Sequence, residues 1–152
     1  MDISGYYSPE ATDVNGQGLL FTQLAHPIRL LETRAGYLGC QMTSAPLSPK
    51  INKVLQAWGS CDGVMIPTSA KAIIGNVTTV TTTAATMISM NSGNVTLYPG
   101  SANQPDVSNL NYVVNQNIPN AFTVGLGNDG KFTICVYDTI DLLIDVSGYF
   151  AP

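Results

Sequence analysis

Short runs of apolar and β-branched residues, separated by polar turn residues, make up most of the chain, and helical periodicity is nearly absent. This spacing predicts an all-β fold: an antiparallel β-sandwich or barrel-like domain of jelly-roll or immunoglobulin-like size, with about ten short strands. The best helical candidate, within residues 51–58, is short and uncapped, so a strand is expected there too. The expected strands are residues 2–7, 18–24, 28–32, 53–58, 70–82, 86–90, 94–98, 110–114, 121–126, 131–137 and 141–149.

Turn-forming residues divide these strands. The sequence Asn-Asp-Gly at residues 128–130 lies between two expected strands and predicts a hairpin, because all three residue types tolerate a positive φ. Ser92-Gly93 predicts a second hairpin. Residues 101–109 are polar and include a proline, so we expect a longer surface loop there.

Two expected strands have distinctive patterns. Residues 70–82 carry apolar groups on both faces in their first half, which predicts a central strand, and their threonine-rich end predicts exposure. Residues 139–150 are the most apolar of all, with Asp141 and Asp145 on the face opposite Leu142 and Ile144. We expect Asp145 to bond to nearby backbone or to an arginine.

The two ends of the chain have nearly the same sequence. Residues 1–9 and residues 144–152 are identical at five of nine positions, with an offset of 143 residues. This duplication predicts a tandem repeat with a unit of about 143 residues, in which 10–152 form a single β domain and 1–9 duplicate its end strand. The alternatives are coincidence and two similar edge strands in one sheet.

If the chain belongs to an array, the duplicated strand is the candidate connector between modules. Only Ser8-Pro9 follow it, and proline ends a strand ladder and stiffens the joint. In a stronger version, an exposed sheet edge of one module accepts the terminal strand of its neighbour. The candidate inter-module residues are Asp2, Ile3, Ser4, Gly5, Tyr6, Tyr7, Asp145, Val146, Ser147, Gly148, Tyr149 and Phe150.

Charge and hydropathy narrow the range of partners. Charged residues make up 11% of the 152-residue chain, the net charge is −4, and the six basic residues are scattered singly, so neither nucleic acid nor a polybasic membrane contact is expected. No run approaches the roughly 18 apolar residues of a membrane span, and no signal peptide is recognisable. Abundant threonine, serine, asparagine and glycine favour an extracellular β protein.

Of the three cysteines, Cys40 and Cys61 flank a turn-rich stretch near expected strand ends, which predicts a disulfide between them. Closing a loop of about 20 residues contributes roughly 3 kcal/mol in the chain-entropy model. Cys135 lies in the middle of an expected strand and predicts a buried free thiol. A zinc site is the alternative, but one histidine and no paired cysteines supply too few ligands.

Several sequence blocks, taken in order, resemble a β-rich domain of secreted and surface-anchored bacterial proteins. In that group the domain ends in a D-V-x-G-Y-F strand, often recurs in tandem and sometimes follows a catalytic domain. The resemblance covers residues 28 to 150 and implies a bacterial cell-surface or appendage role, without catalytic residues. The blocks are residues 29–34 (RLLETR), 66–67 (IP), 70–78 (AKAIIGNVT), 95–99 (VTLYP), 108–112 (SNLNY), 117–124 (NIPNAFTV) and 144–150 (IDVSGYF).

No pattern predicts catalysis, a cofactor or a metal. The single histidine, His26, precedes a proline and suits a surface turn better than a catalytic triad. Paired aspartates would suit a glycosidase, but Asp2, Asp138, Asp141 and Asp145 are more simply turn or edge residues. A calcium site formed by Asn128, Asp129 and Asp138 is a weaker alternative.

Three further features concern single side chains. Glu32 and Arg34 flank Thr33 on one strand face and predict a salt link that closes the sandwich, with Asp145 as a further partner; the alternative is a carboxylate-binding arginine. Asn76 and Asn94 begin N-x-T sequences, and Asn94 is the more accessible candidate for glycosylation. The hydroxyl-rich stretch 78–86 is a candidate for O-linked sugar.

These features favour a structural module of an extracellular fibre, stalk or appendage, whose partners are copies of itself or neighbouring repeats. The alternative is a carbohydrate-binding or adhesive module that contacts cell-surface glycans through an exposed aromatic row. That row would contain Tyr37, Trp58, Tyr98 and Tyr112. An enzyme, the third class, would need a cleft converging on His26 or on paired aspartates.

Overall fold

The computed structural model describes Tyr6 and residues 18–80, 92–113 and 116–152, and this part of the chain is all-β, without a helix. The prediction of an all-β, sandwich-like fold is therefore confirmed, and the sheets do not close into a barrel. The strands are β1 (Leu20–Glu32), β2 (Gln41–Met42), β3 (Lys53–Gln56), β4 (Gly59–Cys61), β5 (Val64–Ile66), β6 (Ala72–Val80), β7 (Ser92–Pro99), β8 (Leu110–Val113), β9 (Ile118–Gly125), β10 (Lys131–Val136) and β11 (Asp141–Ala151).

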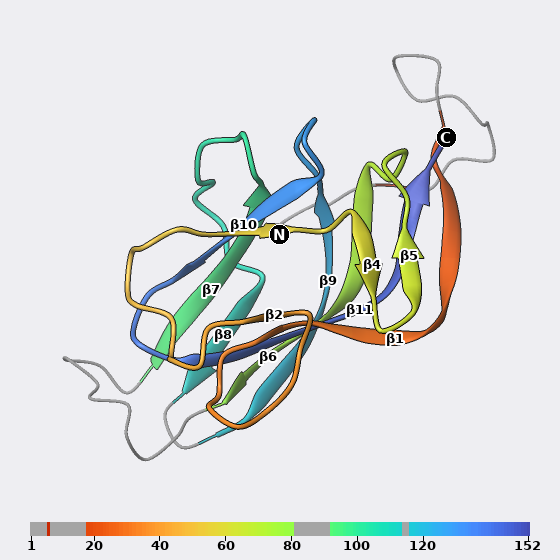
Figure 1. Cartoon of the computed structure of the whole chain (residues 1–152). Helices are drawn as coiled ribbons and strands as arrows, with labels where there is room; N and C mark the ends of the chain where they lie inside the picture. Colours follow the sequence, from red (N-terminus) through yellow and green to blue (C-terminus); the bar gives the residue numbers. More distant parts are fainter. Residues whose placement is uncertain (1–5, 7–17, 81–91, 114–115) are drawn as a thin grey trace.

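The strands form two main sheets and one small hairpin (Figure 1). One sheet has the order β2-β1-β11-β6-β9, the other has the order β3-β10-β7-β8, and β4 pairs with β5. The sheets are antiparallel with one exception: β2 runs parallel to β1, with Leu31 opposite Gln41. The expectation of a purely antiparallel fold is wrong at this point, because residues 33–40 carry the chain back before β2 begins.

A single core lies between the two sheets. Alternate residues of β6, β11 and β10 point into it, and they include Ile73, Val77, Leu142, Ile144, Phe132 and Ile134, all without solvent exposure. This period of two is the pattern that predicted the strands. Strand β6 lies between β11 and β9, so its predicted central position is confirmed, but Thr79 at its threonine-rich end is fully buried rather than exposed.

The outer face of the β7–β10 pair is also covered. The segment between β7 and β8 folds back over this face, where the hydroxyl of Thr96 donates to the carbonyl of Val107 at 2.9 Å and the amide of Leu97 donates to the Asn109 side chain at 2.7 Å. Tyr98 and Cys135 are buried on this face. The predicted long loop at residues 101–109 is thus confirmed.

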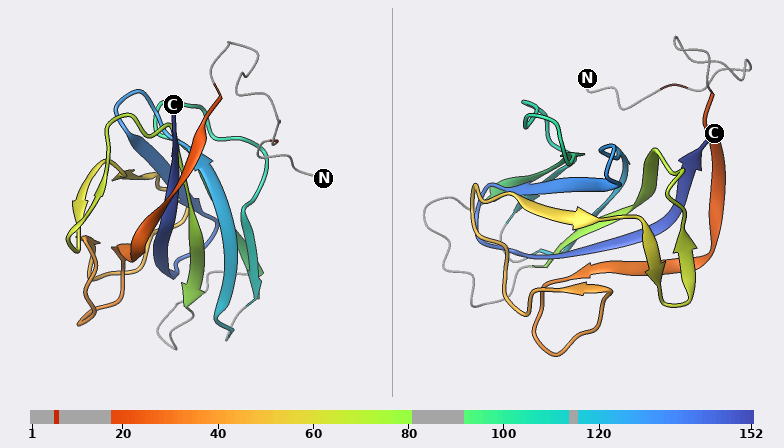
Figure 2. Two further views of the ribbon diagram at one scale, coloured as in Figure 1. Left: turned by 90° about the vertical axis from the view of Figure 1, so that its right-hand side faces the viewer. Right: turned by 45° about the horizontal axis from the view of Figure 1, so that its top comes forward.

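Strands β1 and β11 bend together near one end of the molecule (Figure 2). The register of β1 against β11 shifts between Gln23 and Ile28, where the expected strands 18–24 and 28–32 join into one bent strand. Strand β11 is irregular against β6 at the same level, between Val146 and Gly148. Gly75 lies opposite Val146, and a Cβ there would collide with the carbonyl oxygen of Asp145, so the close approach of these strands requires glycine.

Both hairpin predictions were wrong in their connections. Residues 128–130 do form a tight turn, with Gly130 at φ 74° donating to the carbonyl of Gly127 at 2.8 Å, but the strands on either side, β9 and β10, belong to different sheets. Ser92 and Gly93 lie inside β7, opposite Val113 and Tyr112. Turn chemistry identifies where the chain reverses, but it does not specify the sheet that the next strand joins.

The tightest hairpin was not predicted. Cys61 and Val64 pair across Asp62 and Gly63, whose φ values are 50° and 74°, and two consecutive positive φ angles are the mark of a two-residue type I′ turn. The Asp-Gly dipeptide was the available signal. Its flanking strands β4 and β5 have only three residues each, too few for an alternating pattern to emerge. Of the other expected strands, 86–90 and most of 2–7 lie outside the described residues.

Candidate functional site

An ionic network joins β1 to β11. Arg29 lies directly opposite Asp145 and donates to both oxygens of its carboxylate, at 2.7 and 3.1 Å, and it also donates to Glu32 at 3.1 Å. The side chain of Arg34 reaches the same Glu32 carboxylate from its other side, at 3.0 and 2.9 Å. The predicted Glu32–Arg34 salt link is confirmed, and the arginine that holds Asp145 is Arg29.

The network is electrically balanced, with two guanidinium groups and two carboxylates. Burial by itself would raise the pKa of Glu32, but hydrogen bonds and charge from Arg34 and Arg29 outweigh it and hold that pKa below its usual value. The hydrogen bonds from Arg29 to Asp145 raise the pKa of the guanidinium, although burial opposes the rise. Because each charge has an opposite partner, these arginines serve the fold rather than capture a carboxylate ligand.

Two of the other aspartates considered as candidate acids, Asp138 and Asp141, also make hydrogen bonds within the fold, and Asp2 lies outside the described residues. The hydroxyl of Thr33 donates to Asp141 at 2.7 Å and accepts the amide of Leu142 at 2.8 Å, all within the buried interior. The carboxylate of Asp138 accepts the amide of Thr139 at 2.7 Å. Two side-chain contacts therefore hold the C-terminal part of β1, and the residue after it, against β11: Arg29–Asp145 and Thr33–Asp141.

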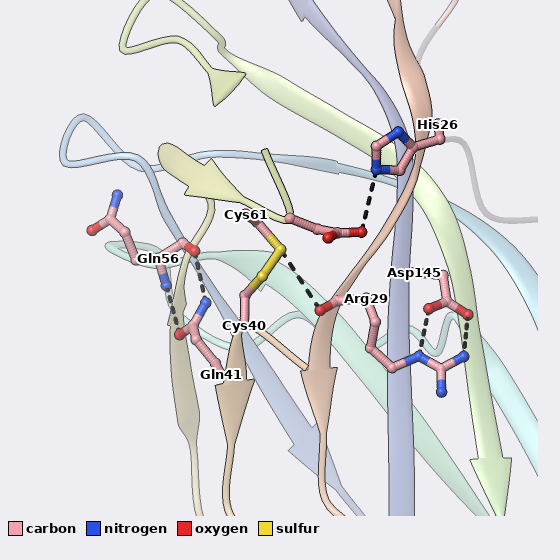
Figure 3. The surroundings of a disulfide bond; sticks show 8 residues. His26, Arg29, Cys40, Gln41, Gln56, Cys61 and Asp145 are labelled. Carbon is pink, nitrogen blue, oxygen red and sulfur yellow. Dashed lines mark hydrogen bonds and ion pairs between the residues drawn. A yellow bond between two sulfur atoms is a disulfide. The ribbon is translucent and has the colours of Figure 1, made fainter. Parts of the chain in front are cut away.

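The predicted disulfide between Cys40 and Cys61 is confirmed, with the Cα atoms 5.7 Å apart (Figure 3). It connects the start of β2 to the β4–β5 hairpin beside β1, where the amide of Cys40 donates to the carbonyl of Arg29 at 3.0 Å. Beside it, the side-chain carboxamide of Gln41 donates to the backbone carbonyl of Gln56 at 2.8 Å and accepts from the backbone amide of Gln56 at 3.4 Å. Cys135 is buried and unpaired, as predicted.

We expect loss of this disulfide to destabilise the fold by about 3 kcal/mol, because it closes a loop of 21 residues in the unfolded chain. The measurement is urea unfolding of the chain and of the Cys40→Ser/Cys61→Ser double variant, each with and without reductant. Reductant should lower the unfolding midpoint of the chain and leave that of the double variant unchanged. Equal midpoints for the two oxidised proteins would contradict the expectation.

The expected row of exposed aromatics does not form. Tyr98 and Tyr112 are buried, and the indole of Trp58 donates to the carbonyl of Ala70 at 2.9 Å while its ring covers Gly130. Of these four residues only Tyr37 is largely exposed, and the Arg34 guanidinium lies 3.9 Å from the centre of its ring. The alternation of side chains along a strand predicts which face of the sheet a residue occupies. It does not predict whether a loop covers that face.

The remaining candidate ligands do not converge. His26 is exposed and contacts Asp62 at 3.3 Å. Asp129 pairs with Lys131 at the start of β10 and Asp138 follows its other end, so the two carboxylates lie beyond opposite ends of a six-residue strand, which spans about 20 Å. Within the described ranges, no three potential ligands are placed to hold a metal ion.

A shallow groove lies at the paired ends of β7 and β8, with a volume of about 450 Å³. Asn94, the glycosylation candidate, lies in it opposite Asn111, and the amide of Tyr137 donates to the Asn94 carbonyl at 3.0 Å. Sequence reasoning missed this groove because its residues come from three separate segments. The lining residues are Ser92, Gly93, Asn94, Asn111, Tyr112, Val113 and Tyr137.

The candidate inter-module residues divide into two groups. Asp145 to Phe150 lie in β11, which pairs with β1 on one side and with β6 on the other, so both edges of this segment are used within the chain. Tyr6 is 72% exposed, and Asp2, Ile3, Ser4, Gly5 and Tyr7 lie outside the described residues. An inter-module role for the N-terminal copy stays a prediction.

The part of the chain that the structure describes contains no helix that is long and apolar enough to cross a membrane. No protein-family model matches the sequence, and no curated protein matches it significantly.

Proposed function

We propose that this chain is a structural, non-catalytic module of an extracellular bacterial tandem-repeat protein that forms a filament, stalk or surface appendage, with modules joined through the duplicated terminal segment. Its partners are then neighbouring repeats or copies of itself. One observation carries the proposal: residues 1–9 repeat the sequence of a strand, the end of β11, that lies in the middle of this module's sheet.

The position of β11 gives the duplicated sequence a specific meaning. Ile144 and Val146 are fully buried, and the strand pairs on both sides. A segment of this sequence completes a module, so residues 1–9 are the final strand of a preceding module in the proposed array. Residues 10–19 then connect that strand to β1, which begins at Leu20.

The entry and exit of the module lie together. Leu20 at the start of β1 pairs with Ala151 at the end of β11, and Figure 1 shows the C-terminus beside the beginning of β1. Successive junctions would therefore follow one line, and the modules would project sideways from it. The positions of the two ends therefore favour modules arranged beside a common line of junctions over the end-to-end stack that the duplicated sequence alone suggests.

Apolar side chains surround this entry and exit point. Leu19, Leu20 and Phe21 are 42%, 68% and 51% exposed, and the ring of Phe21 lies 5.5 Å from that of Phe150. Exposed apolar side chains gathered at one end of a β protein are an expected feature of a protein contact. The disulfide is consistent with an oxidising, extracellular setting.

The test is a chain of three consecutive 143-residue units, imaged by negative-stain electron microscopy and measured by small-angle X-ray scattering. We expect a regular spacing between units that is lost in the Leu20→Ser/Phe21→Ser variant, because this variant removes the apolar contact at each junction. Ile51→Ser is the control, since Ile51 is 64% exposed and lies outside this group of apolar side chains. Units that move independently in the unmodified chain would contradict the proposal.

A carbohydrate-binding role is the second candidate. The groove that contains Asn94 and Asn111 favours it, in place of the aromatic row.

A further inference from the structure

We propose that the groove at the ends of β7 and β8 binds a neutral oligosaccharide. It lies at the end of the sandwich opposite the entry and exit point: β6 runs from Ala72, opposite Phe150, to Val80, opposite Asp141, and the lining residue Tyr137 comes just before Asp141 in the chain. Its volume of about 450 Å³ falls within the usual range of ligand sites. The inference rests on the groove and is independent of the proposed array.

The polar side-chain groups of the groove are the carboxamides of Asn94 and Asn111 and the hydroxyls of Ser92, Tyr112 and Tyr137. Asn94 and Asn111 are cross-strand partners, so their side chains lie on the same face of the sheet. The Asn111 Oδ1 accepts from the Ser108 hydroxyl at 3.0 Å, which leaves the Nδ2 group of Asn111 to donate. The Asn94 carboxamide has no hydrogen bond to any residue that the structure describes, and it presents both a donor and an acceptor, the pair that vicinal sugar hydroxyls require.

An exposed aromatic ring borders these carboxamides. Tyr137 is 45% exposed, and its amide bonds to the Asn94 carbonyl at 3.0 Å, which fixes the start of its side chain beside Asn94. Val113, 43% exposed, adds an apolar surface on the β8 side. An aromatic ring beside planar amides offers one surface for the apolar face of a sugar ring and polar groups for its hydroxyls.

The lack of charged side chains in the groove indicates which class of sugar it binds. None of its lining residues is charged, although Lys50 lies nearby, where its amide donates to the carbonyl of Val136 at 2.9 Å. The nearest carboxylate in sequence to Tyr137 is Asp138, which is buried and bonded to the amide of Thr139. A neutral oligosaccharide therefore fits better than an anionic glycan or a nucleic acid, each of which requires basic partners.

The site is open and shallow, so a single groove would bind weakly. In the proposed array, however, the grooves would face away from the line of junctions and repeat once per module. Linked weak sites raise the overall affinity for a polymeric glycan by about 10² to 10⁴. The single module is therefore the right object for testing the site itself.

The experiment is a titration of the ¹⁵N-labelled chain, produced in a host without N-glycosylation so that Asn94 stays unmodified, with cellohexaose, mannohexaose and a heparin hexasaccharide. We expect amide shift changes at Asn94, Asn111 and Tyr137 with at least one neutral hexasaccharide. At about 10 mM sugar, a site with a Kd of about 1 mM would be roughly nine-tenths filled. Tyr137→Ala and Asn111→Ala should each weaken binding about tenfold, and Tyr37→Ala, which removes an exposed tyrosine elsewhere, should not.

Three results would overturn the inference: no shift with either neutral sugar, stronger binding of the heparin fragment, or shifts located away from the groove. Unfolding midpoints of the variants, measured in parallel, show whether lost binding reflects lost folding. A failed titration together with regularly spaced three-unit chains would leave the proposed structural function in place. Binding together with irregular chains would support the groove alone.

Discussion

A chain of residues 10–143 is expected not to fold, whereas a chain of residues 10–152 should keep the unfolding midpoint of the intact protein. The first truncation removes Ile144 and Val146, which are fully buried, together with the strand that pairs β1 to β6. Each buried aliphatic side chain contributes about 1.5–3 kcal/mol, so losing them with two strand ladders approaches the total stability of a typical domain, about 5–15 kcal/mol. Circular dichroism and thermal unfolding measure both outcomes.

The same truncated chain tests whether the two ends are equivalent. A peptide of residues 1–9, added to the chain of residues 10–143, should restore β structure, because it supplies Asp2 at the position of Asp145 and Gly5 at the position of Gly148. The peptide of residues 144–152 is the positive control and a scrambled version is the negative one. Rescue by 144–152 but not by 1–9 would show that the duplication is not a repeated strand.

Glu32→Ala is expected to destabilise the fold by about 3 kcal/mol, because it removes a buried carboxylate and leaves Arg34 without its acidic partner, while Arg29 keeps its contact with Asp145. Here the carboxylate is fully buried and accepts from both Arg29 and Arg34. Urea unfolding measures the change. Asp129→Ala, which breaks the exposed pair with Lys131, is the matched control and should leave the midpoint unchanged.

The Glu32 network also predicts a pH dependence. Its carboxyl has a folded-state pKa below the usual 4.5, so its stabilising contribution is present above that value and is lost as pH falls through the folded-state pKa. The Glu32→Gln variant cannot titrate at this position. Its stability deficit relative to the unmodified chain should therefore shrink in acid, and a deficit that stays constant from pH 7 to about pH 3 would contradict this assignment.

Particular residues show how far the sequence could predict the fold and the site. The alternation at Ile73 and Val77 identified β6, and the spacing of Cys40 and Cys61 identified the disulfide, because both signals are local or depend on residue type alone. Glu32 and Arg34 were paired correctly because they share a strand face two residues apart. Asp145 could not be assigned to Arg29 in the same way, since their contact spans 116 positions and depends on strand register.

The site was less predictable than the fold. From the sequence, Tyr98 and Tyr112 could not be distinguished from exposed aromatic residues, yet both are buried. The segment between β7 and β8 covers the face of the sheet that contains Tyr98, and the ring of Tyr112 packs against Gly93. Asn94 and Asn111 become a pair only because β7 and β8 meet in the observed register. A shift by one residue would place them on opposite faces.

The sequence by itself determined the all-β class, the disulfide, the buried thiol of Cys135 and the duplication of the terminal strand, since residue type, period and repetition are properties of the chain. The tertiary structure decided which sheet each strand joins, which faces are covered, and that the duplicated sequence forms a central strand whose end lies beside the start of β1. The physical reason is that long-range strand pairing is selected by burial and register across the whole molecule, which no local pattern specifies.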